Sequence, residues 1–287
     1  MDWVNAIVQG TLLGGLYALF AAGLSLIFGV MRLVNIAHGD LIVLGAYLGL
    51  TVTAATGLHP LLALLLVVPT MAAIGYVLQR GLLNQTLGDD LLPPLLVTFG
   101  LSVILQNTLL EVYSADPQKI SAGALDTASV QLGGLSLGVL PLFTFGLAIA
   151  VIWGLQWMFY RTAMGRAFRA VSDNQDIAQL MGLNRRHVFG LAMALALGVT
   201  AIAGILLGIR TSFDPAIGGG RLIFGFEAAI IGGLGNLWGT LAGGVILGVA
   251  QTVGAKIDPG WQILSGHLAF LLILAIRPNG LFPRISA

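Results

Sequence analysis

The sequence contains no cysteine and few charged residues. The absence of cysteine excludes disulfides, thiolate nucleophiles, iron–sulfur clusters and cysteine-based zinc sites within this chain. The formal net charge of +1 is unlike that of a nucleic-acid-binding protein, which needs clustered Lys and Arg. Charged side chains make up only 9% of the 287 residues, whereas about a quarter of a soluble domain is charged. A soluble fold is therefore excluded, and the lipid bilayer is the expected surroundings.

The apolar residues, by contrast, are abundant and occur in long runs. They make up 57% of the chain, and the mean hydropathy is +0.95. Runs of about 20 apolar residues are typical of transmembrane helices, while a β-barrel would show short alternating strands. We therefore expect an all-α polytopic membrane protein, forming a single transmembrane domain over residues 1–287. The eight predicted spans lie near residues 4–29, 40–57, 60–79, 93–113, 139–160, 187–209, 238–255 and 261–276.

A ninth apolar piece, residues 222–234, is too short to cross a bilayer comfortably. Glycines bracket it on both sides, and irregular backbone at membrane depth is tolerated only where protein or water surrounds it. The segment is therefore predicted to be a broken or re-entrant helix. The bracketing glycines are Gly218, Gly219 and Gly220 on one side and Gly232, Gly233 and Gly235 on the other.

The basic residues predict how the chain is oriented. Five of the thirteen Lys and Arg residues lie in residues 161–186, and loops rich in Lys and Arg stay in the cytoplasm. Counting spans from there places the N-terminus and the 114–138 loop outside. If residues 222–234 carry the chain across, nine basic residues lie inside, and if they do not, eight do. The side of the C-terminus therefore stays open at this point.

The basic loop, residues 161–187, also predicts a short surface helix over about residues 173–181. Ser172 followed by Gln175 fits a capping box, and Asp173 and Asp176 suit the positive end of a helix. Gly182 suits the position just after the helix. A helix this short is marginal in water alone. Two interpretations remain open: the helix lies on its own bundle, or it docks on another protein through Ile177, Leu180 and Met181.

Two further polar islands interrupt the apolar sequence. The first is Asn35-Ile-Ala-His-Gly-Asp40, which is either a proton-relay site or a turn whose Asn and Asp cap the next helix. Its single His and carboxylate are too few for a metal site. The second contains Glu227, which is either a functional intramembrane acid or a carboxylate near a helix start that serves the free N–H groups. The polar residues inside the spans, Gln106, Asn107, Gln251 and His267, are expected to make interhelical hydrogen bonds.

Catalytic motifs are absent from the sequence. A phosphate-binding loop needs Gly-Lys-Ser or Gly-Lys-Thr, and neither Lys119 nor Lys256 follows a glycine. No His-Glu-x-x-His motif occurs, and neither Ser25 nor Ser265 stands in a Gly-x-Ser-Gly sequence like that of an intramembrane serine protease. The chain is therefore not expected to be an enzyme or to hydrolyse ATP by itself.

Four segments, in this order, resemble the permease family of the branched-chain amino acid ABC transporters. They are Gly29-Val-Met-Arg-Leu-Val-Asn-Ile-Ala-His-Gly39, Thr162-Ala-Met-Gly-Arg-Ala-Phe-Arg-Ala170, the glycine-rich block from Phe224 to Gly239 around Glu227, and Arg277-Pro-Asn-Gly-Leu-Phe282. The resemblance covers essentially the whole chain. The lack of a long N-terminal extension is similar to the shorter of the two permeases in such systems.

The resemblance implies a permease of a bacterial importer in the inner membrane. Its expected partners are a second, related permease, two cytoplasmic ABC ATPases that bind ATP and Mg²⁺, a periplasmic substrate-binding protein and lipid. No cofactor or nucleic acid is expected on this chain. The cargo would be branched-chain or other hydrophobic amino acids, or related small amides or acids.

The resemblance also suggests sites. The family's coupling segment falls on residues 161–187, which favours the docking interpretation of the short helix. The coupling residues are Gly165, Arg166, Arg169, Ala170, Asp173, Asp176, Ala178 and Gly182. The candidates for the translocation path or its gate are Asn35, His38, Gly39, Glu227, Gly232, Gly233 and Gly235. The alternative is an ion- or proton-coupled secondary transporter, which would carry charged residues at mid-span on several helices.

Overall fold

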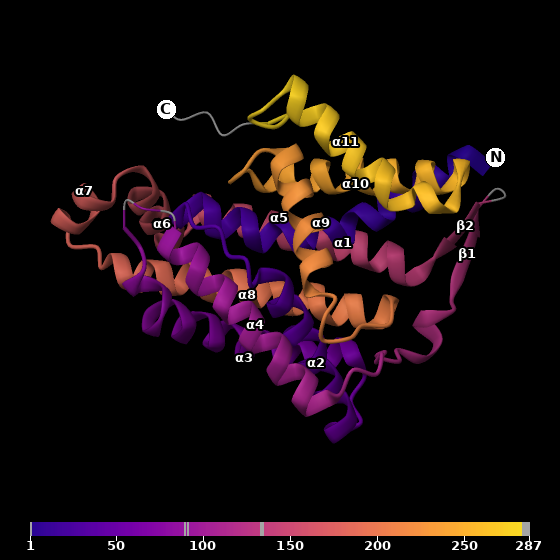
Figure 1. Ribbon diagram of the computed structural model, residues 1–287, viewed down its shortest axis with the longest axis horizontal. Helices are drawn as coiled ribbons and strands as arrows, with labels where there is room; N and C mark the ends of the chain where they lie inside the picture. Colours follow the sequence, from indigo (N-terminus) through magenta and orange to yellow (C-terminus); the bar gives the residue numbers. More distant parts are fainter. Residues whose placement is uncertain (1, 89, 91, 133–134, 283–287) are drawn as a thin grey trace.

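The computed structural model describes residues 2–88, 90, 92–132 and 135–282 (Figure 1). The described chain is built almost entirely of α-helices. Their bounds are α1 Asp2–Met31, α2 His38–Thr56, α3 Pro60–Gly81, α4 Leu92–Tyr113, α5 Val139–Arg161, α6 Ala163–Asp173, α7 Gln175–Leu180, α8 Arg185–Arg210, α9 Gly218–Gly232, α10 Leu237–Ile257 and α11 Gln262–Ile276.

Eight of these helices are long and apolar enough to cross a membrane: α1, α2, α3, α4, α5, α8, α10 and α11. The prediction of an all-α polytopic protein with eight spans is confirmed. A pair of short strands was not predicted from the sequence. β1, Ser129–Leu132, pairs in antiparallel register with β2, Leu135–Gly138, ahead of α5.

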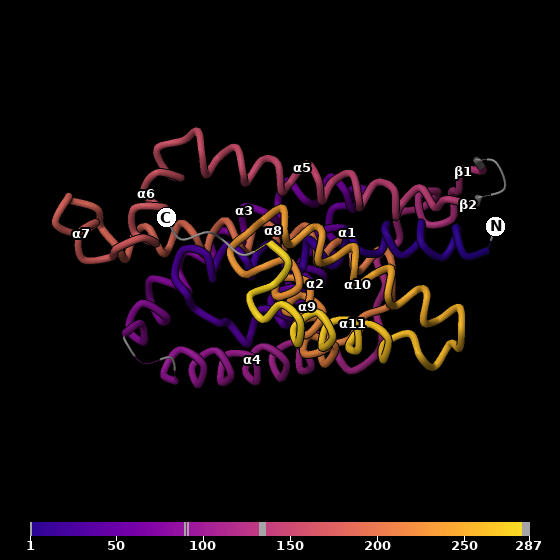
Figure 2. The backbone as a smooth tube through the Cα atoms, turned by 90° about the horizontal axis from the view of Figure 1, so that it is seen from above, coloured from indigo at the N-terminus to yellow at the C-terminus, as the bar shows by residue number. Residues whose placement is uncertain are grey.

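The core of the bundle consists of α1 and α8. The most apolar stretch of α1 is 89% buried and that of α8 is 83% buried, while those of α4 and α11 are only 17% and 6% buried. A helix that is apolar on all sides is typical of a buried position. Figure 2 shows α4 and α5 at opposite edges of the bundle, and Figure 1 shows α11 at its upper edge. Many apolar side chains of these three helices are exposed.

The crossing of α1 over α10 depends on glycines. A Cβ on Gly14 would overlap the backbone of Val245, and a Cβ on Gly248 would overlap the carbonyl oxygen of Gly10. In lipid no hydrophobic force draws helices together, so small residues that permit close backbone contact hold such crossings. The glycine-rich composition thus explains the tightest contact in the bundle.

The two ends of the molecule carry different segments. Figure 1 shows the N-terminus and the β1–β2 hairpin at one end and α6 and α7 at the other. The Lys256 ammonium lies 3.4 Å from the Asp2 carboxylate, so the end of α10 is beside the start of α1. From there α11 runs back towards the end that carries α6 and α7. This agrees with the charge count that puts nine basic residues on the side of residues 161–187, although Arg284 lies outside the described residues.

The short helix α9 lies across the direction of the long spans (Figure 1). Its fifteen residues rise about 22 Å, less than the roughly 30 Å of a bilayer core. The predicted short helix is present, but it is continuous and not broken. Gly218, Gly219 and Gly220 form its first turn and do not interrupt it. Gly233 and Gly235, with φ of 98° and 81°, make the turn into α10, which only glycine adopts without strain.

Candidate functional site

The loop between α5 and α8 folds as two helices, α6 and α7. The Thr162 hydroxyl caps α6 by accepting a hydrogen bond from the Gly165 N–H at 3.1 Å. The Asn174 side chain caps α7 by accepting from the N–H groups of Asp176 and Ile177, both at 3.0 Å. The short helix predicted over about residues 173–181 is therefore present as Gln175–Leu180, but its cap is Asn174 and the prediction of Ser172 as its cap is wrong.

The reason for the error lies on another helix. Ser172 is inside α6, and its hydroxyl donates to the Gly29 carbonyl near the end of α1 at 2.8 Å. It is thus engaged elsewhere, and Asn174 ends one helix and starts the next. The Ser172–Gly29 hydrogen bond links the surface loop directly to the buried core helix.

Two of the predicted coupling residues fix α6 to its own bundle. A Cβ on Gly165 would overlap the carbonyl oxygens of Phe159 and Met158 at the end of α5. The Arg169 guanidinium donates to the Phe159 carbonyl and lies 5.2 Å from the centre of the Tyr160 ring. A cation at the last carbonyls of a helix interacts favourably with its dipole. Arg169 and Gly165 thus join α6 rigidly to α5.

The other predicted coupling residues divide between the outer and inner faces. Arg166, Ala170, Asp173 and Asp176 are exposed. Ala178 is only 4% exposed, because it faces the bundle beneath α7. Ala178 therefore packs α7 against its own bundle and is not accessible to a partner. Gly182 has a left-handed φ of 86° just after α7. The prediction that this glycine follows the end of the helix is therefore confirmed.

The outer face of α7 is apolar and uncovered in this chain. Ile177 is 58% exposed, Leu180 is 87% exposed and Met181 is 79% exposed. A short helix beyond the long spans gains nothing from showing three large apolar side chains to water. This face, which we call the α7 face, is the part of the loop best suited to contact another protein.

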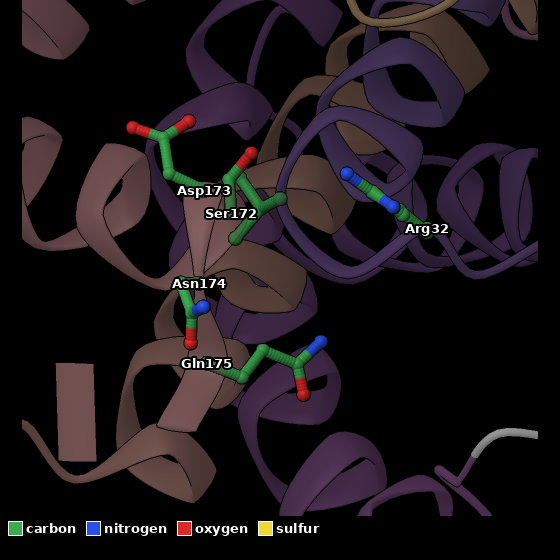
Figure 3. Close-up of a pocket in the computed structure, with 6 residues that line it drawn as sticks. Arg32, Ser172, Asp173, Asn174 and Gln175 are labelled. Carbon is green, nitrogen blue, oxygen red and sulfur yellow. The ribbon is translucent and has the colours of Figure 1, made fainter. Parts of the chain in front are cut away.

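A cleft of about 240 Å³ separates the end of α1 from the α6–α7 junction. It is lined by Val30, Arg32 and the four residues Ser172, Asp173, Asn174 and Gln175. Figure 3 shows the Arg32 side chain on the opposite side of the cleft from Ser172 and Asp173. Arg32 has a φ of 53°, a left-handed conformation that ends α1 abruptly.

The Asn35–Asp40 island is a buried packing centre. The Asn35 side chain accepts from the Ala37 N–H at 3.0 Å, so the predicted turn is confirmed. The His38 ring bonds the Phe20 carbonyl of α1 at 2.9 Å. A Cβ on Gly39 would overlap the carbonyl oxygen of Gly218 in α9. The three residues therefore hold α2 against α1 and α9.

Asp40 does not cap α2, contrary to the predicted role. Its carboxylate accepts from the Ser102 hydroxyl at 2.5 Å and from the Gln106 amide at 3.0 Å. Asp40 is 1% exposed and joins α2 to α4, which makes few other contacts with the core. The sequence signal was available, since an acid within an apolar span is rarely incidental.

Glu227 is the tenth residue of α9 and is therefore far from the helix start. The prediction that it serves free N–H groups there is wrong. Its Oε1 lies 2.5 Å from His267 Nδ1 of α11, and its Oε2 is shielded from solvent without a hydrogen-bond partner. Glu227 thus holds the peripheral helix α11 against α9.

The remaining predicted residues are explained by contacts between α9, α10 and their neighbours. A Cβ on Gly232 would overlap the Gly239 carbonyl, so Gly232 permits the close contact of α9 with α10. The Tyr17 hydroxyl donates to Gln251 at 2.5 Å, an interhelical bond as predicted. Asn107 instead bonds the Val103 carbonyl of its own helix. Within the described residues no group of three His, Asp or Glu could hold a metal ion.

Comparison with known proteins identifies the family. A sequence model described as "Branched-chain amino acid transport system / permease component" matches residues 6–276. The chain belongs to this permease family. It is 28% identical to the high-affinity branched-chain amino acid transport system permease protein BraD of Pseudomonas aeruginosa, over 98% of this chain and 96% of that protein. It is 27% identical to LivH of Escherichia coli over the same shares.

The chain is also similar, over smaller shares of their length or at lower identity, to proteins that are not named as amino-acid permeases. The fructose import permease protein FrcC of Rhizobium meliloti is 29% identical, over 88% of this chain and 72% of that protein. The solved structure of PsaBC from Streptococcus pneumoniae in complex with Fab matches with a TM-score of 0.50 and 15% identity, over 94% of this chain and 91% of that chain. That likeness concerns the fold alone. The family match and the eight spans together make this a multi-pass membrane transport protein.

Proposed function

We propose that this chain is a transmembrane permease subunit of an ATP-binding-cassette importer of branched-chain or other hydrophobic amino acids in the bacterial inner membrane. The family match over residues 6–276 carries the proposal. The relatives BraD and LivH, which align over nearly their whole lengths, support the cargo. The family match also disfavours an ion-coupled secondary transporter.

The proposed assembly contains two ATPases, a second related permease and a periplasmic binding protein. The sequence has no nucleotide-binding loop, so ATP and Mg²⁺ would bind the ATPase subunits. The α7 face supports a cytoplasmic partner, because Leu180 and Met181 are largely exposed. The outward apolar surfaces of α4 and α11 support contact with lipid and a second permease.

The contacts of α6 and α7 suggest how ATPase movement would reach the path. A partner bound to the α7 face would displace α6, because Asn174 caps α7 directly at the end of α6. Arg169 and Gly165 would carry the displacement to α5, and Ser172 would carry it to α1. Rigid elements that shift as units are a common means of such switching.

ATP-dependent uptake of labelled leucine into proteoliposomes tests this function. The chain reconstituted with its ATPases, second permease and binding protein should accumulate leucine only with ATP. The chain alone should insert into the bilayer without catalysing uptake. Accumulation driven by an ion gradient in the absence of ATPase would overturn the proposal and favour a secondary transporter.

A further inference from the structure

Two arginines inside the bundle lack the partners that buried cations normally have. Within the described residues the side chains of Arg210, at the end of α8, and Arg221, in α9, make no hydrogen bond or ion pair. Nη1 of Arg210 and Nε of Arg221 are nevertheless shielded from solvent. Withdrawing a charge from water is costly unless the charge is paired. The last turn of α8 would suit a cation, yet Arg210 donates to none of its carbonyls.

The Tyr17 hydroxyl of α1 lies within electrostatic range of both guanidinium groups, one from α8 and one from α9. That hydroxyl already donates to Gln251 Oε1 at 2.5 Å. Gln251 is 1% exposed, and its Nε2 is shielded without a partner. Shielded N–H donors without a partner therefore occur on Gln251, which contacts Tyr17, and on two arginines within electrostatic range of it.

The neighbouring acids do not neutralise this cluster by direct contact. Asp214 interacts with Arg221 at longer range, and its Oδ1 accepts from the Ala216 N–H at 2.8 Å. Glu227 interacts with Tyr17, but its Oε1 is bonded to His267. Within the described residues, neither arginine therefore forms an ion pair with a carboxylate.

Two aromatic rings pack against Tyr17, and the first turn of α9 is partly exposed and has no side-chain cap. The Phe224 ring centre is 5.1 Å from that of Tyr17, and the Phe20 ring centre is 6.1 Å away. In the first turn of α9, Gly219 and Gly220 face open space, and Ile217 supplies no side-chain cap. A helix start of this kind adds positive potential next to Arg221.

We propose that Arg210 and Arg221, with the Tyr17–Gln251 pair, form a transient binding site for the carboxylate of the substrate on the translocation path. The aromatic wall of Phe20 and Phe224 would contact its apolar side chain. The site lies towards the end of the molecule that carries the N-terminus, since α8 ends there with Arg210 (Figure 1). This inference rests on the proposed function and narrows its cargo to molecules with a carboxylate, as opposed to sugars or neutral amides.

A pair of ligands that differ only in charge tests the site directly. Isovalerate and isovaleramide have the same apolar group, but only isovalerate is an anion. In thermal unfolding of the purified complex without binding protein, isovalerate should raise the midpoint by about 2 °C or more, and isovaleramide should not. Equal shifts, or no shift with isovalerate, would overturn the site. An isovalerate shift in a complex that fails to transport leucine would keep the site and reject the proposed function.

Substitutions then connect the site to transport. Arg210→Gln with Arg221→Gln should abolish the isovalerate shift and lower leucine uptake at least tenfold, while ATP hydrolysis stimulated by loaded binding protein stays within twofold. Arg210→Lys with Arg221→Lys keeps both charges and should retain at least a third of the uptake. Lys256→Gln, which removes an exposed charge at the same end, is the matched control. Full leucine uptake by the double Gln variant would refute the role in transport. If that variant does not fold, the comparison of isovalerate with isovaleramide still tests the site.

Discussion

Shortening Leu180 should weaken attachment of the ATPase to this chain without destabilising the chain itself. Leu180 is 87% exposed, so the folded chain gains little from its side chain. If the α7 face docks in a groove of the ATPase, that side chain becomes buried only on assembly. Leu180→Ala therefore isolates the docking free energy from the folding free energy.

The expected magnitude follows from the exposed surface. Burying a whole leucine side chain is worth about 1.5–3 kcal/mol. Because nearly all of Leu180 is available for burial and alanine keeps one of its four side-chain carbons, the substitution should cost about 1–2 kcal/mol. That loss corresponds to a roughly fivefold to thirtyfold higher dissociation constant. Ile177, 58% exposed, should show a smaller effect.

The assay is titration of the purified ATPase against the chain in nanodiscs, with the thermal midpoint of the chain measured in parallel. Leu65→Ala is the matched control, because Leu65 is 73% exposed on α3 within a membrane span. Its substitution should leave ATPase affinity unchanged. The docking argument fails if Leu180→Ala binds the ATPase as tightly as wild type, or if Leu65→Ala weakens binding equally.

Two further predictions concern packing inside the bundle. Gly39→Ala should lower the unfolding free energy by about 1–3 kcal/mol, because the new Cβ meets the Gly218 carbonyl. Gly219→Ala, with open space around it, should be neutral or stabilising, and equal destabilisation of both in a detergent thermal-shift assay would contradict the close contact. Glu227→Gln should keep its oxygen as an acceptor for His267, while Glu227→Ala should cost about 1–3 kcal/mol. Equal losses in the two Glu227 variants, measured in the same assay, would show that the charge matters and not the hydrogen bond alone.

The spans were predictable because a run of apolar residues long enough to cross the bilayer needs no knowledge of its neighbours. The start of α9 could not be predicted in this way, because a run of glycines usually interrupts a helix. Glycine is needed at position 218 because Asp40 of α2 lies where a Cβ would stand. That packing joins residues far apart in sequence.

The same limit applies to the candidate sites. Ser172 and Asn174 are both good helix caps, and only the bond from Ser172 to Gly29 decides between them. Glu227 was recognised as unusual, but its partner His267 is on another helix. The sequence does not indicate that Arg210 and Arg221 act together, because Tyr17, with which both interact, lies near the middle of α1.

Crosslinking from two glutamine positions tests the central claim that α7 docks on the ATPase. Gln179 is exposed on α7, and Gln131 is exposed in β1 at the opposite end of the molecule. In the assembled importer, Gln179→Cys should crosslink to the ATPase, and Gln131→Cys should not. Crosslinks from Gln179→Cys to the binding protein alone, or from Gln131→Cys to the ATPase, would contradict both the orientation of the chain and the role of α7.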